Sequence, residues 1–157
     1  MFKREVEFFI FDIFIAILKI EQTSSKFTNP QNLLYSYTDW DSVIREFEII
    51  GEASKYLLNE NILQQEHRVV VDFRNVIIHE YFGIDSDEVW DIIHYKLKNF
   101  KKVILKIISS IDTDLKIELA DAFIEDNKYL DFVTKELEAL KSTQEVKNTT
   151  SPKLKPW

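Results

Sequence analysis

The chain has 157 residues, about the length of one domain; 45% of them are hydrophobic and 30% are charged. That balance is typical of a soluble, core-forming protein and excludes a wholly disordered or collagen-like chain. Two glycines and three prolines are too few for an all-β sandwich. The absence of cysteine excludes disulfide scaffolds, thiolate zinc sites and cysteine nucleophiles, and we expect a cytoplasmic protein. The net charge of −7 argues against a broad nucleic-acid-binding surface, so such chemistry would need a local basic pocket.

An apolar run near the N-terminus extends from Phe8 to Leu18. It is about half as long as a bilayer-spanning helix must be, and Asp12 interrupts it. Acidic residues stand beside the basic ones that precede it, and no small-residue cleavage site follows. We therefore expect neither a secretory signal nor a membrane anchor. The run predicts a helix that is buried on most of its surface, in a core or a subunit interface.

Apolar residues recur at helical spacing along most of the chain, and β-type alternation never lasts more than a few residues. The spacing predicts helices over 2–21, 39–58, 68–82, 85–110 and a helical region over 113–141. We therefore predict an all-α bundle domain over 1–112, a helical extension over 113–141 packed on it, and a flexible tail over 142–157.

Local signals refine these helices. Gly51 lies inside the second one, where glycine costs about 1 kcal/mol relative to alanine, and this indicates the close approach of another helix. Gly83 is expected to cap the end of the third helix and Asp85 the start of the fourth. Asp39 and Asp41 are expected to help start the second helix.

The third predicted helix carries a possible reactive cluster. Arg74 and Tyr81 are seven residues apart and share a face, and Asn75 and His79, four apart, share an adjacent strip. Arg74 and His79 are about 140° apart around an ideal helix. Both can still bracket one ligand, because the arginine side chain is long and His79 lies near the helix end.

An arginine together with a histidine suits phosphodiester chemistry. The guanidinium holds a phosphate bidentately and stabilises charge that builds on it. The imidazole takes or gives a proton near neutral pH. RNA supplies its own nucleophile, the 2′-hydroxyl, so no metal ion is strictly required. The competing interpretation is purely structural: Arg74 pairs with Asp72 or Glu80 at the surface, and His79 caps the end of the helix.

The sequence of this segment resembles the Arg-x-x-x-x-His-x-Tyr motif of HepT-type toxins in the HEPN superfamily. The stretch from Ser42 to Ala53, SVIREFEIIGEA, resembles the second helix of that family. The stretch from Arg74 to Asp85, RNVIIHEYFGID, resembles its motif helix, and Trp90 with the two isoleucines that follow resembles the start of its next helix. The resemblance covers roughly residues 5–105. The linker over 62–67 departs from the family pattern because it lacks the usual proline and tryptophan, and the chain also extends beyond the usual short domain.

The resemblance implies a fold and an activity. The fold is a HEPN-type four- or five-helix bundle, here with a C-terminal helical extension, that forms a homodimer with its two motifs facing across a cleft. The activity is metal-independent endoribonuclease cleavage of RNA, either tRNA or mRNA, with no cofactor. Carried onto this chain, Arg74 and His79 are catalytic and Asn75 supports them.

The resemblance also implies a biological setting. HepT-type proteins act as the toxin of a toxin–antitoxin pair, of a type II or type VII kind. Their partner is a minimal nucleotidyltransferase (MNT) that uses ATP and Mg²⁺ to attach AMP to the motif tyrosine, here Tyr81. A different class of function also remains open, in which the bundle is a non-catalytic module that binds or supports a nucleotidyltransferase. A plain dimeric helical scaffold is a third reading, and requires the motif match to be a coincidence.

Three further groups carry weaker signals. A basic strip on the fourth predicted helix is either a solvated face or a guide for an RNA backbone, and consists of Lys98, Lys101, Lys102 and Lys106. His67 and Arg68 either extend the basic pocket or lie in a solvated loop. Asp91 and His94 are spaced as a carboxylate–imidazole pair, but no other histidine or cysteine is near, so no metal site is predicted there.

Overall fold

The computed structural model describes the backbone of residues 3–142 and of Trp157, and the side chains of these residues except 3–5 and Tyr81. The α-helices in chain order are α1 (Lys3–Ser24), α2 (Pro30–Tyr35), α3 (Tyr37–Asn59), α4 (Arg68–His79), α5 (Ser86–Asp91), α6 (Leu97–Ser109), α7 (Thr113–Asp126) and α8 (Asp131–Lys141). Short 3₁₀ turns over Gln65–His67 and Tyr81–Gly83 flank α4, and a π-helical turn over Ile92–Lys96 joins α5 to α6. The described residues contain no strand, and the predicted all-α bundle is confirmed.

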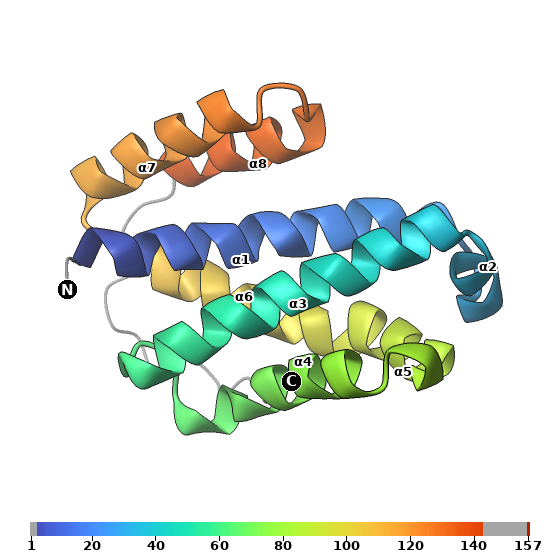
Figure 1. Ribbon diagram of the computed structural model, residues 1–157. Coiled ribbons are helices and arrows are strands. Elements are labelled where there is room, and N and C mark those ends of the chain that lie inside the picture. The colour runs from blue at the N-terminus through green and yellow to red at the C-terminus, as the bar shows by residue number, and fades with distance from the viewer. Residues whose placement is uncertain (1–2, 143–156) are drawn as a thin grey trace.

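Helix α1 is the central element of the fold. Helices α3 and α6 pack on one side of it and the α7–α8 hairpin on the other, so that neighbours surround it (Figure 1). This arrangement buries the predicted apolar run, including Ile10, Phe11, Ile13, Phe14, Ile15, Ala16, Ile17, Leu18 and Ile20. The expectation of a largely buried helix is therefore confirmed. No helix in the described part of the chain has both the length and the apolarity to cross a membrane.

The third predicted helix ends earlier than expected. Helix α4 stops at His79, and the backbone N–H of Glu80 donates to the carbonyl oxygen of Val76 over 2.8 Å. The prediction that Gly83 caps this helix is wrong, because the chain first turns into a 3₁₀ segment in which Gly83 N–H donates to Glu80. The expected cap at Asp85 is confirmed, since its carboxylate accepts a hydrogen bond from the backbone N–H of Asp87 at 2.9 Å.

Two other boundaries differ from the prediction. Helix α2 was not expected, although its start carries a recognisable signal: Asn29 accepts from the N–H of Asn32, and Pro30 follows at the first helical position. The region over 113–141 is helical as predicted but divides in two. The break occurs at Asn127, whose backbone and side-chain N–H groups both donate to the carbonyl oxygen of Phe123 and so end α7.

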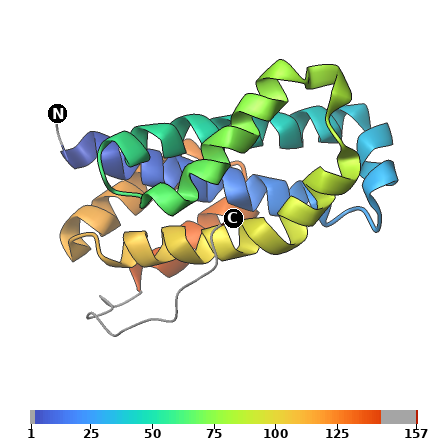
Figure 2. The same cartoon turned by 90° about the horizontal axis from the view of Figure 1, so that it is seen from below.

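Helices α7 and α8 form an antiparallel hairpin that lies along α1 (Figures 1 and 2). The Phe123 ring stacks on Phe11 of α1, with ring centroids 5.3 Å apart, and also meets Phe8. The predicted extension therefore shares the core of the bundle. Of the segment expected to be a flexible tail, residues 143–156 lie outside the described residues, while the Trp157 side chain is 8% exposed. Its indole contacts rings from three helices, namely Phe47, Phe73 and Phe100.

Helices α3 and α4 approach each other closely at Gly51, as the sequence predicts. A Cβ atom added at Gly51 would overlap the Cβ and Cγ atoms of Arg74. The Arg74 Cβ is fixed to the backbone of α4, so it cannot swing aside as the end of a flexible side chain would. The lack of a side chain at Gly51 thus sets the distance between these two helices and the position of the Arg74 stem.

We expect Gly51→Ala to lower the free energy of unfolding by about 2 kcal/mol, because overpacking a tight contact outweighs the gain in helix propensity. Gly83→Ala is the matched control: a Cβ there meets nothing within 4 Å and Gly83 has no positive φ. Its effect should stay within about 0.5 kcal/mol. Urea unfolding of both variants measures the two values, and equal stability of the two variants would contradict the assigned role of Gly51.

Candidate functional site

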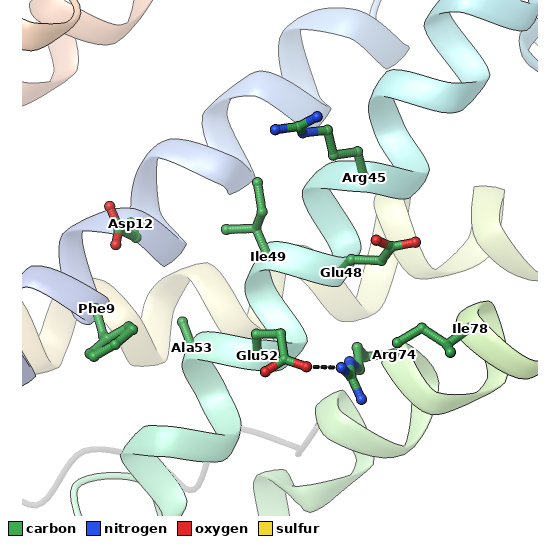
Figure 3. Close-up of a pocket in the computed structure, with 9 residues that line it drawn as sticks. All are labelled: Phe9, Asp12, Arg45, Glu48, Ile49, Glu52, Ala53, Arg74 and Ile78. Carbon is green, nitrogen blue, oxygen red and sulfur yellow. Dashed lines mark ion pairs between the residues drawn. The ribbon is translucent and has the colours of Figure 1, made fainter.

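Arg74 lies on α4 with its side chain directed at α3. Its Nη2 forms an ion pair with the carboxylate of Glu52, one residue beyond Gly51 (Figure 3). Its Nη1 donates to Oδ1 of Asn75 at 3.0 Å, and its Nε is buried without a partner. The Arg74 side chain is 23% exposed and that of Glu52 is 54% exposed. The guanidinium is therefore oriented by two neighbours yet stays within reach of solvent.

His79 is the last residue of α4 and is exposed. Among the described residues, no hydrogen bond or ion pair holds its ring, and the helix end is capped by Glu80 instead. Arg74 pairs with Glu52 rather than with Asp72 or Glu80. The partners expected for Arg74 and the cap expected of His79 are therefore wrong, although Arg74 does form an ion pair with a carboxylate. Tyr81 begins the 3₁₀ turn two residues further on, and its side chain lies outside the described part of the structure.

His79 shares an outward-facing stripe of α4 with apolar side chains. Val69 and Val76 are seven residues apart and are each 39% exposed, and Asp72 and His79 repeat the same spacing beside them. Phe82 follows in the 3₁₀ turn and is fully exposed. The outward face of α4 therefore combines apolar side chains with the imidazole of His79.

A cleft of about 390 Å³ opens between α1, α3 and α4 beside Arg74 (Figure 3). Apolar side chains form part of its wall, and charged side chains of both signs form the rest. Its lining residues are Phe9, Asp12, Arg45, Glu48, Ile49, Glu52, Ala53, Arg74 and Ile78. The carboxylates outnumber the arginines, and Glu52 occupies one edge of the Arg74 guanidinium.

Asp12 stands on the α1 side of this cleft. Its side chain keeps an exposed face, but the surrounding helices exclude enough water to raise its carboxyl pKa, and Lys19 opposes that shift. The sequence reasoning did not assign Asp12, Arg45, Glu48 or Glu52 to the site. Glu52 lay within the string that resembles the family's second helix, but only the contact between α3 and α4 shows that it meets Arg74.

The structure separates the other predicted residues from Arg74. His67 is 4% exposed and packs on Phe100, so it is neither a solvated loop residue nor part of a basic pocket. Burial lowers the pKa of His67, and Glu66 opposes this. Of the basic strip on α6, Lys101 pairs with Glu21 at 2.7 Å, while Lys98 and Lys102 are exposed.

The predicted pair between Asp91 and His94 is not formed. His94 Nδ1 makes a hydrogen bond of 2.8 Å with the Trp90 carbonyl oxygen, and its ring lies tilted against the Trp90 indole, with centroids 4.2 Å apart. Within residues 3–142, no group of three or more histidine, aspartate or glutamate side chains is arranged to hold a metal ion. Asp39 does support the start of α3, since it accepts from Lys26 and Ser36, and these bonds lower its carboxyl pKa.

Comparison with known proteins identifies relatives for most of the chain. A family model described as "Ribonuclease HepT-like" matches residues 13–107. The Putative RNase MJ1380 of Methanocaldococcus jannaschii is 34% identical over 65% of this chain and 95% of its own length. The Probable ribonuclease HepT of Thermococcus cleftensis is 32% identical over 63% of this chain and 92% of its own length. These matches confirm the resemblance, and α7 and α8 lie beyond the residues that the family model matches. No solved structure matches the chain.

We expect Glu52→Gln to raise the affinity of Arg74 for inorganic phosphate by roughly two- to threefold, because it removes the carboxylate that competes for a partly exposed guanidinium. Glu48→Gln is the matched control, since it removes one negative charge from the same cleft without touching the ion pair. Phosphate titration followed by NMR of the arginine N–H groups measures both. An equal gain in the two variants would show a general charge effect and contradict the specific competition.

Proposed function

Because the chain belongs to the HepT-like ribonuclease family, we propose that it is an endoribonuclease that cuts RNA without a metal ion, in a cleft between two protomers. Arg74 and His79 are the reacting side chains. The observation that carries this proposal is their placement on α4. The guanidinium is oriented by Glu52 and Asn75, and the imidazole is exposed at the helix end, with no hydrogen bond or ion pair to any described residue. Both are therefore available to a phosphodiester.

A homodimer accounts for two features of the single chain. Arg74 and His79 leave α4 about 140° apart, so one helix does not close around a scissile phosphate from both sides. The stripe with Val69, Val76 and His79 is exposed and partly apolar, as expected of a self-complementary interface. Two copies of α4 meeting along this stripe would set each His79 near the motif of the other protomer.

In the proposed reaction, the His79 imidazole of one protomer accepts the proton of the ribose 2′-hydroxyl. The 2′-oxygen attacks the phosphorus, and the bond to the 5′-oxygen breaks. The second His79, protonated, delivers a proton to that leaving oxygen. Arg74 stabilises the extra negative charge on the phosphoryl oxygens in the transition state. The products are a 2′,3′-cyclic phosphate and a 5′-hydroxyl, and the RNA is a tRNA or an mRNA.

The proposal extends to regulation through Tyr81. We place the protein as the toxin of a toxin–antitoxin pair whose partner, an MNT nucleotidyltransferase, uses ATP and Mg²⁺ to attach AMP to Tyr81. Tyr81 follows His79 by two residues, and an added AMP would put a bulky phosphate beside the motif. That group would block RNA by occupying its place and by pairing with Arg74.

The second candidate is a HEPN module that binds a nucleotidyltransferase without cutting RNA. The acidic excess of the cleft and the net charge of −7 favour it, because both weaken RNA binding. The presence of both Arg74 and His79 favours the nuclease.

We expect His79→Ala and Arg74→Ala each to slow RNA cleavage by at least about 100-fold, since they remove proton transfer and charge stabilisation respectively. His94→Asn is the control, because this histidine is held by Trp90 outside the cleft. Excess EDTA should leave the wild-type rate unchanged. Cleavage of a labelled RNA measures all four conditions, and wild-type activity in His79→Ala would reject the catalytic assignment.

We expect co-expression with a cognate MNT nucleotidyltransferase to increase the mass of the chain by whole AMP units and to abolish RNA cleavage. Tyr81→Phe should remain unmodified, and Tyr129→Phe, which changes an exposed tyrosine on the α7–α8 loop, should be modified normally. Intact mass and peptide mapping test this. AMP found on another residue, or full cleavage activity of the modified chain, would contradict the proposed regulation.

A further inference from the structure

A second pocket, of about 270 Å³, lies between α1, α3 and α7, on the other side of Asp12 from Arg74. Three carboxylates and one lysine reach it: Asp12, Glu46, Asp126 and Lys19. Its excess of negative charge persists after Lys19 is counted. Because α7 lies beyond the residues matched by the family model, one wall of this pocket belongs to the extension of this chain.

Glu46 is the unusual residue of this pocket. Its side chain is 9% exposed, and among the described residues no hydrogen bond or ion pair reaches its carboxylate. Burial raises its pKa, and the positive charges of Lys19 and Arg45 oppose this only from a distance. A carboxylate that is largely removed from water and has no paired cation costs stability, and a cation bound in the pocket would offset that cost.

The other residues that line the pocket indicate which kind of cation fits it. Ile15, Ile49 and Phe123 give apolar surface on which methylene groups can lie. Asn127 is 8% exposed, and its Nδ2 already donates to the Phe123 carbonyl, so its Oδ1 is left as an acceptor for an N–H group. The carboxylates are not gathered around one point as metal ligands in the described part of the chain. Carboxylates that are set apart from one another, with apolar surface between them, suit a ligand with several ammonium groups on an aliphatic chain.

We propose that this pocket binds a small aliphatic polyamine, with its ammonium groups paired to Glu46, Asp12 and Asp126 and its methylene chain lying on Phe123 and Ile49. Asp12 borders both pockets, so the bound cation lies close to the cleft that contains Arg74. The proposal is independent of RNA cleavage, because it rests on the pocket alone.

Calorimetric titration of the full chain with putrescine and spermidine, at ionic strength fixed with NaCl, tests the proposal. We expect saturable binding of one molecule per chain, and no binding of 1,4-butanediol, which has the same chain with hydroxyl ends. Glu46→Gln should weaken binding by at least about tenfold, since it removes the charge-assisted pair. This variant should fold, because it removes a buried charge and keeps the size of the side chain.

Two further variants make the outcome decisive. Asp126→Asn changes an exposed residue at the pocket rim and should also weaken binding. Glu136→Gln removes one exposed carboxylate from α8, outside the pocket, and should bind as the wild type does. The site is overturned if spermidine binds Glu46→Gln and Glu136→Gln equally well, if binding does not saturate, or if butanediol binds as tightly as putrescine.

Discussion

The contact between Gly51 and Arg74 is the constraint on which the rest of the site depends. It allows α3 and α4 to approach so closely that the arginine stem lies against the backbone of α3. The next residue, Glu52, is then in place to pair with the guanidinium, while Asn75 holds its other edge. The same contact turns the opposite face of α4 outward, together with His79. Helix α4 thus has the hydrogen-bonded and ion-paired guanidinium of Arg74 on its inner side and the exposed imidazole of His79 at its end.

The ion pair between Arg74 and Glu52 bears on how RNA would bind. Its side chains are 23% and 54% exposed, so the pair contributes little to stability, and a phosphate would replace the carboxylate at small cost. In the proposed function, Glu52 would keep the guanidinium ordered until RNA arrives. The charged part of the cleft wall has three carboxylates and two arginines, so a phosphate would bind at an arginine rather than along the surface. Local charge, and not the net charge of −7, would then decide where RNA binds.

Helical periodicity predicted the main elements because α1, α3, α4 and α6 each bury a long apolar stripe. It missed α2, whose six residues are too few to show a period, and it missed the break at Asn127, where a side-chain hydrogen bond ends α7. The motif predicted Arg74, Asn75 and His79 as site residues. It did not predict that Glu52 binds Arg74 or that Glu46 is buried without a partner, because both depend on how separate helices pack.

The central claim, that the reacting groups come from two protomers, is tested most directly by mixed dimers. Wild-type chains are unfolded and refolded with an excess of His79→Ala chains, so that nearly every wild-type chain pairs with a variant chain. We expect RNA cleavage per wild-type chain to fall by at least about tenfold, because a mixed dimer has only one of the two His79 side chains that the reaction uses. Unchanged cleavage per wild-type chain in a mixture that forms mixed dimers would contradict the claim.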